Sequence, residues 1–313
     1  MASVQTASVD GGALAFEVVS SDSEPVLAIH GISSQRKLWY WLRAADPGLS
    51  LIAPDLRGRG DSTQVQGPSS MSRHATDLVA VLDQLGLDAV HVCGMSMGGF
   101  VAIELATSHP DRVKSVVLVD GGFPMAAPPG LTREMLPAVF GDRLARLDRE
   151  WPSVRDYAGF FVANTAPLLD PADPLLLDYL AHDLVDHRVR LSSAALIADA
   201  ADIFFGPSSW QRLRVPARLL TAQWSTGAGS PPAYPAAAVQ GFRDALGGVL
   251  VAVRPLAGAD HAASIMSPAG GEATAALLRD ALATPAHAAT PAHAAAPAGA
   301  VGPAGAATAQ QPS

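Results

Sequence analysis

Short apolar segments alternate with segments of helical periodicity over most of the chain, and this alternation constrains the fold more than any other feature of the sequence. The apolar runs lie at residues 26–29, 49–53, 90–93 and 113–119. Helical periodicity marks residues 72–85 and 97–107, which lie between these runs. Strands that alternate with helices form a parallel sheet with helices on both faces. The sequence therefore predicts an α/β fold with a mostly parallel sheet.

The alternation stops after Gly122 and returns about ninety residues later. Residues 123–214 show helical patterns and no clear strand. Strand patterns resume at residues 218–222 and 249–253, with helices near residues 236–246 and 267–282. We therefore predict an α/β core built from residues 1–122 and 215–283, which opens with a hairpin around Asp10-Gly11-Gly12. Residues 123–214 are predicted to form a helical cap.

The last thirty residues differ in composition from the rest. Residues 284–313 contain no Asp, Glu, Lys or Arg, are rich in Pro and Ala, and repeat Thr-Pro-Ala-His at Thr284 and Thr290. Such a segment cannot bury enough apolar surface to offset the entropy of ordering it. We predict a disordered tail in which His287 and His293 are solvated rather than bound to a metal.

The composition and net charge limit the classes of partner and the cellular location that we expect. The net charge is −8 and no cluster of Lys or Arg interrupts it, so nucleic acid is not an expected partner. No apolar run approaches the roughly 18 residues of a membrane span. The N-terminus lacks the features of a signal peptide. A single cysteine, Cys93, excludes an intrachain disulfide, and we expect it to be a buried apolar side chain. We expect a cytoplasmic protein, and the sequence predicts no oligomeric state.

Gly94-Met95-Ser96-Met97-Gly98 is a G-x-S-x-G pattern with a predicted strand before it and a predicted helix after it. A sharp strand-to-helix turn crowds the backbone, so the flanking positions require glycine and the serine hydroxyl is exposed beside a helix N-terminus. A glycine-rich turn with an incidental serine is the alternative. The placement favours Ser96 as a nucleophile.

A serine hydroxyl needs a base. Among the nine histidines, His261 is distinguished by its place in the loop after the last predicted strand and before the last helix. Loops at the carboxyl ends of parallel strands share one edge of the sheet. His261 is therefore the predicted general base.

Four motifs together resemble the α/β-hydrolase superfamily over residues 10–283, apart from the cap. They are His30-Gly31 after a strand, the segment from Asp55 to Ser62, the segment from Gly94 to Gly99, and the Gly258-Ala259-Asp260-His261 sequence. The resemblance implies Ser96 as nucleophile, His261 as base, and an oxyanion hole from the backbone N–H groups of Ile32 and Met97. Nothing in the sequence implies a metal or an organic cofactor.

The third triad residue departs from the family's usual position. The loop after residues 218–222 contains no acidic residue, and the first one beyond it is Asp244. Some members, dehalogenases among them, take the acid one strand earlier, and here Asp120 closes residues 113–119. We predict Asp120 as the triad acid. The alternatives are that Asp120 caps a turn, or that Asp260 fills the role.

The resemblance to serine-dependent members implies hydrolysis of a carboxylic ester or lactone of a small hydrophobic substrate, because dehalogenases and epoxide hydrolases of this fold use an aspartate at the serine's position. Hydrolysis of a C–C bond or cofactor-free perhydrolysis by the same triad remains an alternative, as does a receptor-like role in ligand capture. We expect Asp55, Arg57 and Arg59 to organise a turn, with contact to a substrate anion as the alternative for the arginines. Met95, Met97 and two or three of eight aromatic side chains are expected at the pocket: Trp39, Trp41, Phe123, Phe160, Phe161, Phe204, Phe205 and Trp210.

Overall fold

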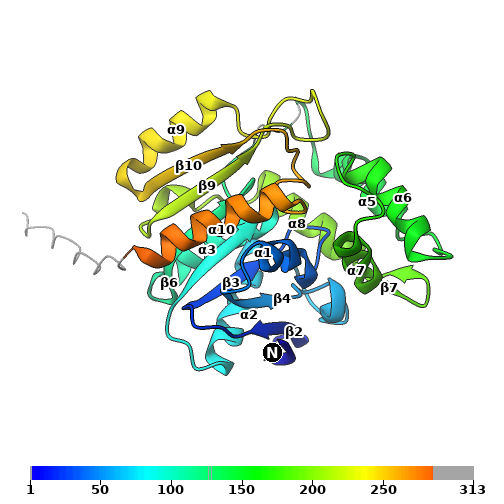
Figure 1. The fold of residues 1–313 in the computed structure, drawn as a ribbon, viewed down its shortest axis with the longest axis horizontal. Coiled ribbons are helices and arrows are strands. Elements are labelled where there is room, and N and C mark those ends of the chain that lie inside the picture. The colour runs from blue at the N-terminus through cyan, green and yellow to red at the C-terminus, as the bar shows by residue number, and fades with distance from the viewer. Residues whose placement is uncertain (1, 126, 128, 285–313) are drawn as a thin grey trace, which may run out of the picture.

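An eight-stranded sheet forms the centre of the molecule (Figure 1). The computed structural model describes residues 2–125, 127 and 129–284. The strands are β1 (Ala2–Val9), β2 (Gly12–Val19), β3 (Pro25–Ile29), β4 (Ser50–Pro54), β5 (Val90–Met95), β6 (Val113–Val119), β9 (Ala217–Ala222) and β10 (Leu250–Leu256). Their order is β1-β2-β4-β3-β5-β6-β9-β10. β2 pairs antiparallel with β1 and β4, and the remaining pairs are parallel. The predicted mostly parallel α/β sheet is confirmed.

Helices cover both faces of the sheet and make two hydrophobic cores. α2 (Met71–Gln84), α3 (Met97–Ser108) and α9 (Ala236–Leu246) contribute to one core, and α1 (Tyr40–Ala45) and α10 (Pro268–Ala283) to the other. Successive strand residues point to opposite faces. In β6, Val116 and Leu118 therefore lie in the first core, and Val117 and Val119 in the second. This two-sided burial explains why the strand is mostly apolar.

The segment between β6 and β9 is mostly helical. It contains α4 (Leu136–Val139), α5 (Gly141–Ala145), α6 (Val154–Thr165), α7 (Pro174–Asp183) and α8 (Ser193–Phe205). In Figure 1, α5, α6 and α7 lie together beyond one end of the sheet, coloured green. We use the name cap segment for residues 123–214. Short 3-10 helices lie at Arg36–Trp39, Gly60–Ser62, Pro110–Arg112, Arg133–Met135, Trp210–Arg212 and Gly247–Val249.

The expectation that residues 123–214 contain no strand is wrong in one place. β7 (Leu184–Val185) and β8 (Arg188–Val189) form a two-stranded antiparallel hairpin. Its two turn residues, Asp186 and His187, both have positive φ, of 49° and 64°. Two consecutive positive φ angles define the turn type that closes tight hairpins. Strands of two residues are too short to show an alternating pattern in the sequence.

Buried ion pairs fix the turn after β4 and tie it to neighbouring elements. Arg57 Nε lies 2.8 Å from Asp77 Oδ2 in α2, and Arg59 Nη1 lies 2.6 Å from Asp199 Oδ2 in α8. Both arginines also donate to backbone carbonyls. These contacts agree with the prediction that the two arginines organise a turn. Neither arginine lines the pocket described below.

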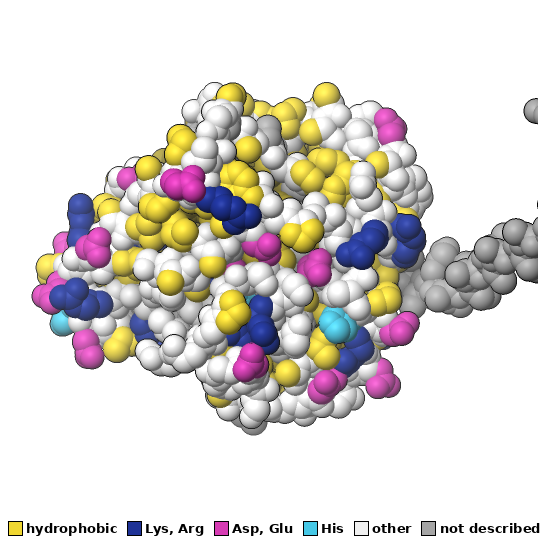
Figure 2. All heavy atoms as spheres, turned by 180° about the vertical axis from the view of Figure 1, so that it is seen from behind, with side chains coloured by type: hydrophobic (Ala, Val, Ile, Leu, Met, Phe, Trp, Pro, Cys, Tyr) yellow, Lys and Arg dark blue, Asp and Glu magenta, His cyan; other side chains and the backbone are white. Residues whose placement is uncertain are grey.

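On the face seen in Figure 2, acidic and basic side chains are interspersed with apolar ones. No helix in the described ranges is long and apolar enough to cross a membrane. Of the tail predicted to be disordered, residues 284–313, only Thr284 is described, and its hydroxyl donates to the Asp280 carbonyl at 2.7 Å. Residues 285–313 lie outside the described part of the chain, together with residues 1, 126 and 128.

Candidate active site

Ser96 occupies the sharp turn between β5 and α3. Its φ of 55° and ψ of −122° are backbone angles that residues other than glycine rarely adopt. A Cβ at Gly94 would come within 2.2 Å of the Gly98 carbonyl oxygen, and one at Gly98 within 2.0 Å of the Ile29 carbonyl oxygen. A Cβ at Gly121 would lie 2.1 Å from the Ser96 carbonyl oxygen. The glycines thus let three backbone segments meet around a strained serine at the start of a helix.

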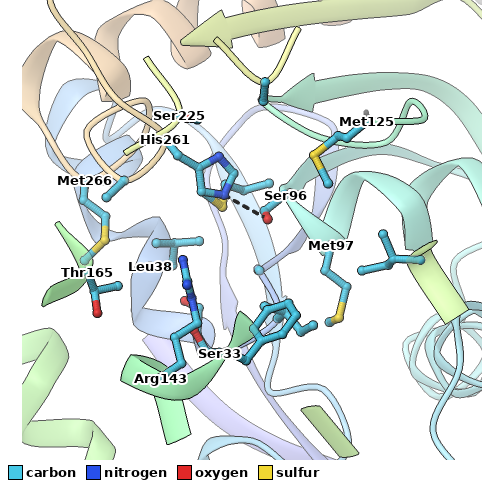
Figure 3. A pocket seen from close by; sticks show the side chains of 18 of the residues that line it. Ser33, Leu38, Ser96, Met97, Met125, Arg143, Thr165, Ser225, His261 and Met266 are labelled. Carbon is cyan, nitrogen blue, oxygen red and sulfur yellow. Dashed lines mark hydrogen bonds between the residues drawn. The ribbon is translucent and has the colours of Figure 1, made fainter. Parts of the chain in front are cut away.

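His261 lies in the loop between β10 and α10 and contacts both other predicted triad residues. Its Nε2 is 3.0 Å from Ser96 Oγ, and its Nδ1 is 2.6 Å from Asp120 Oδ2 (Figure 3 shows the bond to Ser96). A carboxylate can only accept, so Nδ1–H donates to Asp120. The neutral ring then has Nε2 free to accept from the serine hydroxyl. This is the arrangement in which an imidazole can remove the serine proton.

Asp120 directly follows β6 in a left-handed conformation, with φ of 43°, and its side chain is buried. Oδ1 accepts a hydrogen bond of 3.0 Å from the Ala222 amide at the end of β9, which leaves Oδ2 for His261. The other candidate, Asp260, accepts instead from the amides of Gly227 and Ala263, at 3.0 and 2.9 Å. The carboxylate paired with His261 is therefore that of Asp120.

The two predicted oxyanion donors lie beside Ser96. Met97 is the first residue of α3, where N–H groups have no intrahelical partner, and Ile32 follows β3. Both line the same pocket as Ser96, and within the described residues neither N–H has a hydrogen-bond partner. Arg59 Nε donates to the Ile32 carbonyl at 3.0 Å, and the Gly31 carbonyl, which shares a peptide unit with the Ile32 N–H, accepts from the Ser34 amide at 3.2 Å. These two donors are free to bind a developing oxyanion.

His30 supports the loop that carries Ile32. It is fully buried, and its Nδ1 donates to the Gly31 carbonyl at 2.8 Å while its Nε2 accepts from the Leu56 amide at 3.0 Å. Burial lowers the pKa of His30 to about 4, although the charge of Asp55 opposes the change. A neutral ring satisfies both bonds, so His30 acts as a structural link between β3 and the loop after β4.

A cavity of about 270 Å³ opens above Ser96 (Figure 3). Both methionines that flank the serine line it, as predicted, and so do two of the eight aromatics considered, Phe161 and Phe204. Trp39, Trp41 and Phe123 instead lie in the hydrophobic cores. The lining also includes Ser33, Ser34, Leu38, Phe100, Met125, Val139, Phe140, Arg143, Thr165, Tyr179, Ile203, Ser225, Ala233, Ala262 and Met266. Of these, the residues from the cap segment carry no sequence motif, and sequence reasoning missed Phe140, Arg143 and Tyr179.

One group in the described residues has the spacing of metal ligands, namely Asp55, Asp61 and His182. Arg36 forms ion pairs with both carboxylates, and Arg190 pairs with Asp61. Burial by itself would raise the pKa of Asp55, but the hydrogen bond from His182 and the charge of Arg36 outweigh it and lower the pKa to about 2. The two guanidinium groups already compensate the carboxylates, so we assign no metal to this group.

Cys93 is fully buried, and burial raises the pKa of its thiol, which makes it an unreactive apolar side chain.

Comparisons with known proteins agree with the fold. A family model described as the alpha/beta hydrolase fold matches residues 24–154. The chain is 30% identical over 215 residues to the putative 2-succinyl-6-hydroxy-2,4-cyclohexadiene-1-carboxylate synthase of Bacillus subtilis (strain 168), which covers 64% of this chain and 74% of that protein. It is 32% identical over 191 residues to epoxide hydrolase 2 of Siraitia grosvenorii, covering 56% of this chain and 59% of that protein. The second match therefore spans less than two thirds of the relative.

Among solved structures, that of E-2-(acetamidomethylene)succinate hydrolase superimposes with a TM-score of 0.68 at 21% identity, over 89% of this chain and 98% of that one. A likeness at this identity shows the fold alone. Sheet order, family model and the Bacillus subtilis relative agree. The chain belongs to the α/β-hydrolase superfamily.

Proposed function

We propose that this protein is a serine hydrolase that cleaves a carboxylic ester or lactone of a small, largely hydrophobic substrate through an acyl-enzyme. The observation that carries the proposal is the continuous hydrogen-bonded chain from Ser96 Oγ through His261 to Asp120, at the base of a mostly apolar cavity. Nucleophile, base and orienting acid are the parts that acyl transfer requires. The names of the relatives describe different reactions, so the choice of reaction rests on the site.

In the proposed mechanism, Ser96 Oγ attacks the substrate carbonyl carbon while His261 Nε2 takes the hydroxyl proton. The carbonyl oxygen becomes an oxyanion that accepts hydrogen bonds from the Ile32 and Met97 amides, each worth a few kcal/mol in the transition state. Asp120 stabilises the imidazolium. The tetrahedral intermediate then expels the alkoxide, to which His261 returns the proton. A water molecule deprotonated by His261 attacks the acyl-serine, and the carboxylic acid leaves as Ser96 regains its proton.

The serine also argues against epoxide opening. If Ser96 attacked an epoxide carbon, the product would be an alkyl ether, which has no carbonyl for water to attack. An aspartate nucleophile gives an ester instead, which water can hydrolyse. With serine at this position, the enzyme would be trapped after one turnover.

We further propose that the cap segment is a substrate-binding cap. It contributes Phe140, Phe161 and Phe204 to the cavity wall, so it would determine which acyl and alcohol groups fit. Most of the cavity wall is apolar, which favours short hydrophobic substituents.

The test compares wild type, Ser96→Ala and a control, Ser108→Ala, on a panel of chromogenic esters, lactones and a vinylogous diketone. Ser108 is exposed near the end of the same helix, α3. We expect Ser96→Ala to lower kcat by about 10⁴ or more on esters, and Ser108→Ala to leave it unchanged. Mass spectrometry after a serine-directed fluorophosphonate should place the adduct on Ser96.

Three outcomes would contradict this proposal. Hydrolysis at the wild-type rate by Ser96→Ala would exclude Ser96 as the nucleophile. Turnover of the diketone alone would replace ester cleavage by C–C hydrolysis with the same triad. Binding of the panel without turnover would indicate a receptor-like protein.

A further inference from the structure

The cavity above Ser96 contains a single permanently charged side chain, Arg143 of α5. Among the described residues that line the cavity there is no Asp or Glu. An arginine in a mostly apolar wall is unusual because a guanidinium group stays charged at any physiological pH and loses hydration when it is covered. The cavity therefore carries one positive charge that its own lining does not neutralise.

Arg143 has no internal partner in the described part of the chain. No ion pair or hydrogen bond joins its guanidinium group to another residue there, and its nearest aromatic neighbour is Phe140, whose ring centre lies 5.8 Å from Arg143 Cζ. Arg146, one turn further, provides the contrast. It is buried, donates to Tyr157 Oη at 2.8 Å and to the Ser33 carbonyl at 2.7 Å, and lies 3.7 Å from Asp183. Arg146 is held by contacts within the fold, whereas no such contact among the described residues accounts for an arginine at position 143.

The electrostatic setting of Arg143 favours an incoming anion. Burial lowers the pKa of Arg143, and the nearby charge of Arg146 acts in the same direction. Asp142 opposes them but forms no ion pair with Arg143. Arg143 is only partly buried and stays charged, and a bound carboxylate would offset its repulsion by Arg146.

Figure 3 shows how Arg143 lies relative to the triad. The side chain extends from the cap segment into the cavity, and in this view it lies on the same side of Ser96 as Leu38 and Thr165. Met97 and Met125 lie on the other side of Ser96. A substrate whose carbonyl is at Ser96 would therefore meet a cation on one side and an apolar wall on the other.

We propose that Arg143 binds a carboxylate of the substrate, so that the preferred substrate is an anionic ester or lactone, such as a monoester of a dicarboxylic acid. The inference rests on the proposed function, because it assumes that a carbonyl is attacked by Ser96 in this cavity. The planar guanidinium group matches a carboxylate with two parallel hydrogen bonds, which a lysine does not reproduce.

The kinetic test uses matched pairs of substrates that differ only in charge. Aryl monoesters of succinic, glutaric, adipic and suberic acid are compared with the same aryl esters capped as methyl esters at the other end, after subtraction of the uncatalysed rate. We expect wild type to favour at least one anionic member by about tenfold or more in kcat/KM. Arg143→Met should reduce that ratio to near one, chiefly through a higher KM for the anion. Arg143→Lys should restore part of the ratio.

The control is Arg155→Met, since Arg155 is an exposed arginine of α6 outside the cavity. It changes the net charge by the same amount and should leave the ratio at its wild-type value. If both variants lower the ratio equally, the effect is one of overall charge, and the proposal is wrong. A wild-type ratio near one for every pair that is hydrolysed would overturn it too, while ester hydrolysis itself stood.

A binding test without turnover separates this inference from the proposed function. In the Ser96→Ala background, calorimetry compares the monomethyl and dimethyl esters of the same four acids. We expect at least one monoester to bind about tenfold more tightly than its diester, and the difference to disappear in Ser96→Ala/Arg143→Met with an unchanged melting temperature. Equal binding of every pair, or a difference that persists without Arg143, excludes the carboxylate site whether or not the protein hydrolyses esters.

Discussion

Asp120 makes two hydrogen bonds that together determine which way its side chain faces. The Ala222 amide donates to Oδ1, and the His261 Nδ1–H donates to Oδ2. Because both neighbours are donors, the site requires two acceptor oxygens, which only an ionised carboxylate provides. The buried Asp120 carboxylate therefore favours the His261 tautomer with its proton on Nδ1, which catalysis needs because Nε2 is then free to accept from Ser96.

Asp120→Asn tests this match. The Asn oxygen will turn to the Ala222 amide, which can only donate, and the NH₂ group will then face His261 Nδ1. That ring nitrogen must become an acceptor, so the proton moves to Nε2 and the ring can no longer accept from Ser96. We expect kcat for ester hydrolysis to fall by about 10⁴ with the fold intact. Steady-state kinetics together with circular dichroism measure both effects.

The comparison variant is Asp260→Asn. Asp260 adjoins His261 in sequence but bonds to two backbone amides, so we expect a loss of stability and less than a tenfold loss of kcat. A larger loss of kcat in Asp260→Asn than in Asp120→Asn would reassign the triad acid.

Residues that belong to a local motif could be predicted from the sequence. Ser96 is marked by its glycines, and His261 and Asp120 follow strands whose carboxyl ends share one edge, so their proximity follows from the topology. Arg143 carries no such mark. Its importance depends on the absence of a partner and on the direction in which α5 presents it, and both are properties of the packed cap segment.

At the scale of elements, α8 is attached to the core through charged side chains as well as apolar ones. Asp199 lies 2.6 Å from Arg59 Nη1 and 3.0 Å from His74 Nε2, and all three side chains are completely buried. Burial would raise the pKa of Asp199, but the charges of His74 and Arg59 outweigh it and hold the pKa well below its usual range. The same Arg59 donates to the Ile32 carbonyl, so one side chain connects α8 to the residue whose N–H is a predicted oxyanion donor.

Asp199→Ala would leave the Arg59 charge buried without its partner. Removing one member of a buried pair costs about 3–5 kcal/mol, and we expect a loss of that size in the free energy of unfolding. Denaturant titration measures it, with Asp244→Ala as the control. Asp244 is exposed on α9, and its variant should lie within about 0.5 kcal/mol of wild type. A loss below about 1 kcal/mol in Asp199→Ala would show that water or rearrangement compensates Arg59.

The sequence predicted the core elements to within a few residues, because strands buried on both faces and amphipathic helices have distinct periodicities. The pattern predicts a helix near residues 236–246, and α9 occupies Ala236–Leu246. Short elements were not predictable in the same way. α1 has only six residues, and the β7–β8 hairpin depends on two left-handed turn residues, Asp186 and His187, that are not glycine or asparagine. Local pattern did not determine these elements, which are held by tertiary contacts.

For the whole molecule, His30 and Asp55 make stability depend on pH in two adjacent ranges. The ordinary pKa of a histidine is 6.5, and burial lowers that of His30 to about 4. Between these values the unfolded chain binds a proton that the folded chain does not, so stability falls as the pH falls from 6.5 to about 4. Asp55 behaves as a salt-bridged acid, with its pKa lowered from 3.8 to about 2, so its contribution is lost only below pH 3.8.

The two contributions can therefore be separated by pH. At 1.36 kcal/mol for each pH unit between the two pKa values, His30 accounts for about 3 kcal/mol of lost stability between pH 6.5 and 4. We expect the free energy of unfolding of His30→Gln to fall by about 3 kcal/mol less than that of wild type over this range, whatever its value at neutral pH. His109→Gln, at a partly exposed histidine near the end of α3, should follow the wild-type curve. Parallel curves for wild type and His30→Gln would mean that folded and unfolded His30 take up a proton at the same pH, so that below pH 6.5 Nε2 could not accept from the Leu56 amide.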